Sequence, residues 1–183
     1  MRRITTGLFT SLDGVVDADD DWQYPYFDEE LFAVIAAGWA AAGAALMGRR
    51  SFEGYEQLRV AHPESPMIGF LDAIPTFVVS STLSVPPRDN VSIIDATVER
   101  IERLRRGGED EGDVLVLGSP TLVRWLLANG LLDELNIAVL PIVVGGGPRL
   151  FDGMPASRVP LALAGSAALG SGALELRYRP ATG

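Results

Sequence analysis

The sequence of 183 residues contains no cysteine. It contains no lysine either, and all 15 of its lysine-or-arginine positions are arginine. The absence of cysteine excludes disulfides, thiolate nucleophiles and zinc sites with thiolate ligands. The absence of lysine excludes a Schiff-base enzyme and a lysine-dependent P-loop. A bound phosphate must therefore be held by arginine, by hydroxyl groups or by the N-terminus of a helix.

Positive charge is in the minority: 15 arginines stand against 24 acidic side chains, and the formal net charge is -9. A surface of this sign repels polyanions and lacks the basic patch that binds nucleic acid. Long apolar runs are absent as well: the Ala-rich stretch 31–47 contains Gly38 and Gly43 and is shorter than the roughly 18 to 20 residues of a membrane span. The segment 1–7 has no apolar signal region. We therefore expect a soluble, cytoplasmic protein with neither a nucleic acid nor a membrane as partner.

The arrangement of apolar residues predicts the fold class. Hydrophobic residues make up 48% of the chain, enough for one buried core, so we expect a single domain over residues 1–183. Apolar runs of strand length alternate with amphipathic segments of helix length, which is typical of an α/β fold. At the end of the chain, two strands joined by a Gly/Ser/Ala segment predict an antiparallel hairpin. The expected sheet is mixed, parallel first and antiparallel at its end.

These patterns give approximate bounds for each element. The predicted strands are Arg3–Thr10, Ala44–Met47, Thr76–Ser80, Ser92–Ile94, Val114–Leu117 and Glu134–Val139, followed by a hairpin of Leu161–Gly165 and Ala173–Tyr178. The predicted helices are Glu29–Ala42, a short piece after Ser51, Val98–Arg106 and Thr121–Ala128.

Four polar turns follow predicted strands, which is where α/β sheets bind ligands. The turn Ser11–Val15 contains Asp13, either a turn former or a functional carboxylate. Gly48–Ser51 opens a helix with two arginines, which suits a phosphate, although an N-capping serine beside two solvated arginines would look the same. Ser80–Thr82 offers three hydroxyls or is an ordinary polar loop. Gly118–Thr121 is a tight turn into a helix and favours contact with a pyrophosphate.

Two further motifs do not support the functions that they suggest. His62-Pro63-Glu64 matches the H-x-E part of a zinc deaminase signature, but the cysteine pair that completes it cannot exist in this chain. Gly145–Gly147 follows an apolar stretch but lacks the spacing of G-x-G-x-x-G and the helix after it. The sequence therefore predicts neither a deaminase nor a Rossmann domain, and we expect no metal site.

In combination and in this order, the motifs resemble the dihydrofolate-reductase-like family, and above all the reductase domain of the bacterial riboflavin-pathway deaminase-reductases. The block 117–151 carries most of the likeness, and Ser11–Gly14 and Gly48–Phe52 extend it over nearly the whole chain. The resemblance implies a three-layer fold with a mixed central sheet flanked by helices. It also implies NADPH as cofactor and hydride transfer to a C=N or C=O carbon of a small-molecule substrate, which can be a pterin, a ribosylaminopyrimidine or an unrelated carbonyl compound.

The resemblance implies a role for each turn at the cofactor. The cofactor phosphates would meet Gly48, Arg49, Arg50 and Ser51, and the adenosine end would meet Ser80, Ser81 and Thr82. The pyrophosphate and ribose would be lined by Leu117, Gly118, Ser119, Thr121 and Leu122. The mobile loop beside the nicotinamide would consist of Leu12, Asp13 and Gly14. Two adjacent arginines supply charge for the extra 2′-phosphate, so we expect a preference for NADPH over NADH.

On the substrate side, the resemblance implies an acidic residue near the start of the first long helix. Asp28 stands at this place, with Trp22 and Phe32 as substrate contacts, although capping of the helix would by itself explain Asp28. Asp13 is the other catalytic candidate. A carboxyl group beside the nicotinamide can orient the substrate or relay a proton through water, and we expect it to contribute little to cofactor affinity.

The family likeness also implies a homodimer, and the apolar run Ile137–Val144, long for a half-exposed strand, points the same way. The residues leave two other functions open: a non-catalytic nucleotide-binding or dimerisation module of the same fold, and a flavin-dependent oxidoreductase. A visible absorbance spectrum distinguishes a flavin-dependent oxidoreductase from the NADPH-dependent enzyme, because bound flavin absorbs visible light and NADPH does not.

Overall fold

The computed structural model describes residues 1–16, 21–107, 111–154 and 158–181. Its strands are β1 (Ile4–Ser11), β2 (Ala42–Gly48), β3 (Thr76–Val79), β4 (Val91–Ile94), β5 (Asp113–Leu117), β6 (Leu135–Leu140), β7 (Leu161–Ala168) and β8 (Leu174–Pro180). Its helices are the 3-10 turn η1 (Tyr24–Tyr26), α1 (Glu29–Ala41), α2 (Arg49–Ala61), α3 (Pro66–Ala73), α4 (Val98–Arg105) and α5 (Pro120–Ala128). Within these residues, no helix combines the length and the apolar character that crossing a membrane requires.

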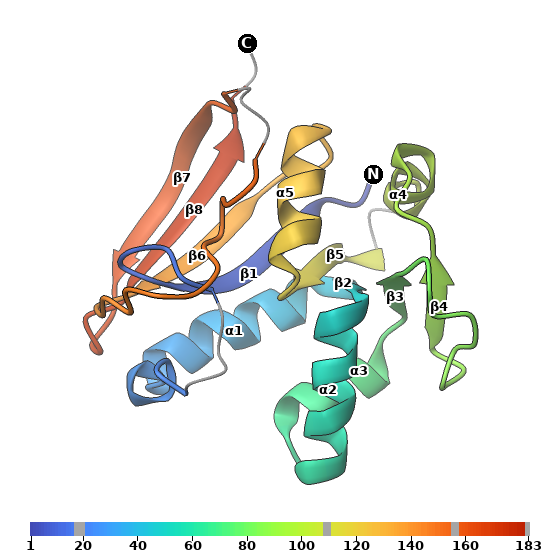
Figure 1. Ribbon diagram of the computed structural model, residues 1–183, viewed down its shortest axis with the longest axis horizontal. Coiled ribbons are helices and arrows are strands. Elements are labelled where there is room, and N and C mark those ends of the chain that lie inside the picture. The colour runs from blue at the N-terminus through green and yellow to red at the C-terminus, as the bar shows by residue number, and fades with distance from the viewer. Residues whose placement is uncertain (17–20, 108–110, 155–157, 182–183) are drawn as a thin grey trace.

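The strands form one sheet with helices on both of its faces (Figure 1). The strand order across the described residues is β4-β3-β2-β5-β1-β6-β8-β7. Every neighbouring pair from β4 to β6 is parallel, whereas β8 pairs antiparallel with both β6 and β7. The predicted α/β fold, with a sheet that is parallel first and antiparallel at its end, is confirmed.

Alternation along the central strands explains the three layers. Successive side chains of a strand point to opposite faces of a sheet. Leu46 of β2 accordingly belongs to the same buried cluster as Ile101 of α4 and Leu126 of α5. Its neighbour Met47 packs with Phe52 of α2 on the other face. Helices α4 and α5 therefore cover one face of the sheet, and α1, α2 and α3 cover the other (Figure 1).

The parallel strands all end at one edge of the sheet. This carboxyl edge receives the turns that follow β1, β2, β3 and β5, which are the four polar turns singled out in the sequence. It also receives the turn after β4, which begins at Asp95, and the segment after β6, which begins at Pro141. Ligands of open α/β sheets bind at this edge, so these turns form the candidate site.

Two helices differ from the sequence prediction. The piece expected after Ser51 is the helix α2 with 13 residues, and the helix α3 with eight residues was not predicted. Helix α2 buries only Phe52 among its residues, and α3 buries only Ile68 and Leu71. So few inward-facing positions leave a weak periodic signal in the sequence.

The apolar run Ile137–Val144 also has a different explanation. Its first part belongs to β6, which lies between β1 and β8 and has four of its six residues buried. A strand inside a sheet that is covered on its faces is apolar for that reason alone. This run therefore no longer supports a homodimer.

Candidate cofactor-binding site

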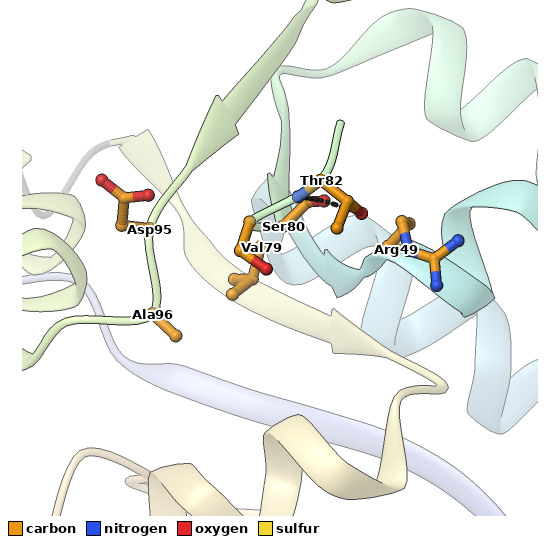
Figure 2. A pocket seen from close by; sticks show the side chains of 7 residues that line it. Arg49, Val79, Ser80, Thr82, Asp95 and Ala96 are labelled. Atoms are coloured by element: carbon orange, nitrogen blue, oxygen red, sulfur yellow. Dashed lines mark hydrogen bonds between the residues drawn. The ribbon is translucent and has the colours of Figure 1, made fainter. Parts of the chain in front are cut away.

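An open cavity of about 330 Å³ lies at the carboxyl edge, over the ends of β2, β3 and β4. This volume is at the lower end of the range for small-molecule sites. The cavity brings Arg49 together with the hydroxyl-bearing turn Ser80–Thr82 (Figure 2). Its remaining lining residues are Val79, Asp95 and Ala96. Sequence reasoning missed Asp95, although its place directly after a predicted strand was a usable signal.

The hydroxyl of Ser80 is held in place by the turn that follows it. Its Oγ accepts hydrogen bonds from the backbone N–H groups of Thr82 at 3.2 Å and Leu83 at 2.9 Å. Its Oγ also lies 3.5 Å from the Oγ1 of Thr82, with either hydroxyl able to donate in that pair, so the two hydroxyls together offer donors and acceptors to a ligand in the cavity.

The two adjacent arginines occupy different surroundings. Arg49 lines the cavity and donates from Nη1 to Oε1 of Glu53 at 2.8 Å, one helical turn further along α2. Both side chains of this pair are 44% exposed. Arg50 is exposed and does not line the cavity. The structure therefore assigns the two arginines unequal access to a ligand bound there.

Two serines join the turn after β2 to the turn after β5. The Oγ of Ser119 accepts from the backbone N–H of Gly48 at 2.7 Å and lies 2.8 Å from the Oγ of Ser51. The backbone N–H of Ser119 donates to the Oγ of Ser51 at 2.9 Å. These contacts fix the starts of α2 and α5 relative to each other at the same edge of the sheet.

The turn after β5 has an unusual backbone. Gly118 and Ser119 have φ values of +54° and +58°, in the left-handed region that favours glycine. A Cβ added at Gly118 would lie 3.1 Å from the Oγ of Ser51, so glycine permits a close approach there. The turn leads directly into α5, whose first-turn N–H groups have no carbonyl partner within the helix. Such a helix N-terminus suits a phosphate.

The neighbours of this turn contribute through different atoms. The carbonyl of Leu117 accepts from the Ser119 hydroxyl at 3.1 Å, and the Thr121 hydroxyl accepts from Arg124 at 3.1 Å. The side chain of Leu122 belongs to the core and is 7% exposed. Leu122 can therefore meet a ligand at the edge only through its backbone.

Asp13 is a hydrogen-bond acceptor that ties two segments together. Its Oδ1 accepts from the Ser11 hydroxyl at 2.7 Å and from the backbone N–H of Val144 at 3.0 Å, and its Oδ2 accepts from the N–H of Gly145 at 3.0 Å. The guanidinium of Arg149 lies 3.6 Å from Oδ2. The Ser11 hydrogen bond, followed by that of Val144, lowers the pKa of Asp13 to about 2. A carboxyl group with this pKa is ionised at neutral pH, which favours a positioning role over donation of a proton.

The loop around Asp13 is anchored on both sides by backbone hydrogen bonds. The N–H of Leu12 donates to the carbonyl of Ile142 at 2.8 Å, and the carbonyl of Gly14 accepts from the N–H of Leu150 at 2.9 Å. The side chain of Leu12 is 66% exposed. These hydrogen bonds join the loop to the segment 142–150, and the mobility that the resemblance implies for it stays a prediction.

The low pKa of Asp13 gives a prediction for stability. Because its folded pKa of about 2 lies below the ordinary value of 3.8, its contribution to stability is present above pH 3.8 and is lost as the pH falls towards 2. The urea midpoint of the wild type is expected to exceed that of Asp13→Asn by a constant amount near neutral pH. The two midpoints should converge as the pH falls through 4 towards 2. A difference that is independent of pH over this interval would show that the charge of Asp13 does not stabilise the fold.

Of the substrate-side candidates, Asp28 and Phe32 lie at the start of α1 and Trp22 precedes η1, and none of them lines the cavity. Asp28 is the N-cap of this helix, because its Oδ1 accepts from the backbone N–H of Leu31 at 2.8 Å, which lowers its pKa. Trp22 is partly buried against a cluster that contains Leu31. Phe32 is 54% exposed, and its ring lies 5.6 Å from that of Phe27. Capping accounts for the position of Asp28, and Phe32 is the more accessible of the two aromatic side chains.

Sequence comparison identifies relatives of the whole chain. Residues 2–174 match the family described as the RibD C-terminal domain. The uncharacterized protein YyaP of Bacillus subtilis (strain 168) is 22% identical in an alignment covering 97% of this chain and 94% of that protein.

Solved structures with the same fold cover the chain almost completely. A Shewanella sp. PV-4 protein named for riboflavin biosynthesis is 20% identical, with a TM-score of 0.79 over 98% of this chain and 99% of its own. A pyrimidine reductase-like protein of Corynebacterium diphtheriae is 13% identical, with a TM-score of 0.71 over 100% of this chain and 93% of its own. A Thermotoga maritima diaminohydroxyphosphoribosylaminopyrimidine deaminase/5-amino-6-(5-phosphoribosylamino)uracil reductase is 16% identical, with a TM-score of 0.65 over 98% of this chain but 57% of its own. These similarities establish the fold.

Proposed function

The chain belongs to the RibD C-terminal domain family, and on that premise we propose that it is an NADPH-dependent reductase. The proposed reaction is hydride transfer to a C=N or C=O carbon of a ribosylaminopyrimidine-like or pterin-like substrate. The Thermotoga maritima relative is named in part as a 5-amino-6-(5-phosphoribosylamino)uracil reductase, and the Corynebacterium diphtheriae relative is named as pyrimidine reductase-like. Both names support the same class of reaction for this chain.

The observation that carries the proposal is the order of the candidate residues along the carboxyl edge. Adjacent strands β3, β2, β5 and β1 end in the turns proposed for the adenosine end, the phosphates, the pyrophosphate and the nicotinamide, in that sequence. Three strand spacings of about 4.8 Å amount to roughly 14 Å, the scale of an extended dinucleotide. Turns that are far apart in the chain thus form one continuous track along the carboxyl edge, and their order matches the order of the groups in the cofactor.

The residues along this track fit NADPH. Arg49 and the hydroxyls of Ser80–Thr82 surround a cavity that suits the adenosine end and its phosphate. The turn at Gly118 and Ser119 leads into the N-terminus of α5, which suits the pyrophosphate. Asp13 holds the Leu12–Gly14 loop against Val144 and Gly145 at the far end. When bound, the nicotinamide would supply the hydride.

A substrate screen that follows NADPH oxidation tests this function. We expect oxidation that depends on both the protein and an acceptor from the ribosylaminopyrimidine, pterin or small carbonyl classes. Binding of NADPH without turnover of any acceptor would instead indicate a nucleotide-binding module of the same fold. A visible absorbance band in the purified protein would indicate a flavin-dependent oxidoreductase.

We propose that the protein is a homodimer and that β7 forms the interface. This strand lies at the edge of the sheet, and none of its eight residues is buried within the chain. The segment 161–172 carries no charged side chain in a chain whose net charge is -9. An uncharged edge strand offers unpaired backbone groups to a second copy without contact between like charges.

Disruption of β7 is therefore expected to yield monomers. Leu163, which is 57% exposed, is replaced by aspartate, and Val60→Asp on α2, where the side chain is 85% exposed, serves as the control. Sedimentation is expected to give a mass near twice 19.6 kDa for the wild type and for Val60→Asp, and near 19.6 kDa for Leu163→Asp. A wild-type monomer at micromolar concentration, or a dimer that Leu163→Asp leaves intact, would exclude this interface.

A further inference from the structure

Two residues of opposite charge line the cavity at the carboxyl edge. Figure 2 shows Arg49 on one side and Asp95 on the other, with Ser80 and Thr82 between them. The Asp95 side chain comes from the turn after β4 and is exposed. Within the residues that the structure describes, its carboxylate has no ion-pair partner, so its charge is not neutralised by a neighbouring side chain.

The positive side of the cavity is weaker than the two adjacent arginines suggested. Arg49 is already paired with Glu53, and Arg50 does not line the cavity. A 2′-phosphate placed there would gain attraction from Arg49 but meet the negative charges of Asp95 and Glu53. Because such a phosphate carries about -1.5 to -2 charges at neutral pH, it feels these carboxylates more strongly than a neutral ribose hydroxyl does.

A carboxylate repels a phosphate but attracts a ribose hydroxyl. An ionised carboxylate only accepts hydrogen bonds, and it can accept one from the 2′-hydroxyl of a ribose. Acidic side chains favour NADH in other dinucleotide sites for this reason. Arg49 and Asp95 therefore favour different forms of the adenosine end within one cavity.

We propose that Asp95 is a specificity-determining residue that reduces the preference of this protein for NADPH over NADH. The proposal rests on the proposed function, since it assumes that the cavity holds the adenosine end of the cofactor. In this arrangement Arg49 attracts the 2′-phosphate, Asp95 opposes it, and the measured preference is the difference between the two effects.

The variant Asp95→Asn tests the proposal, because asparagine keeps the size of the side chain and removes its charge. Calorimetric titrations with NADPH and NADH give the ratio of their dissociation constants. Titrations with adenosine 2′,5′-bisphosphate and AMP examine the adenosine end alone and require no turnover. The control Glu64→Gln removes the same unit of charge from a side chain that is 76% exposed and lies beyond the C-terminus of α2.

We expect Asp95→Asn to tighten NADPH and adenosine 2′,5′-bisphosphate by about threefold or more at low ionic strength, with a smaller gain in high salt. Binding of NADH and AMP should stay the same or weaken, so that the ratio rises, whereas Glu64→Gln should leave the ratio unchanged. If the wild type binds both dinucleotides and Asp95→Asn does not raise the ratio beyond that of Glu64→Gln, Asp95 has no such role, and the proposed function stands. If neither dinucleotide binds the wild type, the proposed function and this inference both fail.

Discussion

Arg49→Ala is expected to weaken NADPH binding by about tenfold or more, in keeping with the loss of a charge-assisted hydrogen bond to a phosphate. The loss of NADH affinity should be smaller, because NADH lacks the 2′-phosphate. Calorimetric titration of both dinucleotides measures the two changes. Arg50→Ala should have a smaller effect than Arg49→Ala, since Arg50 does not line the cavity.

Arg103→Ala is the matched control for this experiment. Arg103 pairs with Glu99 on α4 across one helical turn, as Arg49 pairs with Glu53 on α2, but it does not line the cavity. Its removal changes the net charge by the same amount and should leave both affinities within about twofold, given the weak effect of exposed ion pairs. Equal losses from Arg49→Ala and Arg103→Ala would mean that Arg49 acts only through the overall charge.

Asp13→Asn is expected to lower turnover by about 100-fold on an identified substrate, through displacement of the loop beside the reacting carbon. Both carboxylate oxygens of Asp13 accept hydrogen bonds, from Val144 and Ser11 on one side and from Gly145 on the other. An amide presents an NH₂ group in place of one oxygen, so one donor must lose its acceptor. NADPH affinity should change by less than about threefold, because the loop lies at the nicotinamide end of the track.

Two further readouts separate positioning from proton transfer at Asp13. Hydrogen exchange at Val144 or Gly145 should become faster in Asp13→Asn, because the amide keeps only one acceptor oxygen for the two N–H groups. Since the pKa of Asp13 is about 2, the pH profile of the wild type should show no ionisation near neutral pH that the variant lacks. Asp72→Asn, which alters a half-exposed carboxylate paired with Arg59, should affect neither readout. Full activity of Asp13→Asn would show that Asp13 only forms the turn and has no role in catalysis.

The sequence predicted the strands and the turns after them because both signals are local. Apolar runs define β2 and β5, and glycine and hydroxyl residues define where they end. The common direction of these strands then brings Arg49 and Ser80 to one edge. Helix α3 escaped prediction because it buries only Ile68 and Leu71 along its length.

The details of the site depend on contacts between distant segments. Val144 lies 131 residues from Asp13 in the chain, so no local pattern reveals that its N–H binds the carboxylate. Ser119 adopts the left-handed backbone conformation, which is expected of glycine and not of serine. Hydrogen bonds with Gly48 and Ser51 stabilise this conformation. The tertiary fold overrides the local preference at this turn.

Transfer of isotope from labelled cofactor tests the central claim most directly. The wild type is incubated with NADPH that carries deuterium at its transferable position, together with 5-amino-6-(5-phosphoribosylamino)uracil, a pterin or a small carbonyl compound, and the products are examined by mass spectrometry. A reductase of the proposed kind places one deuterium on the carbon that was part of the C=N or C=O group of its substrate. Bound NADPH that transfers no deuterium to any of these acceptors would contradict the proposal that this chain is a reductase.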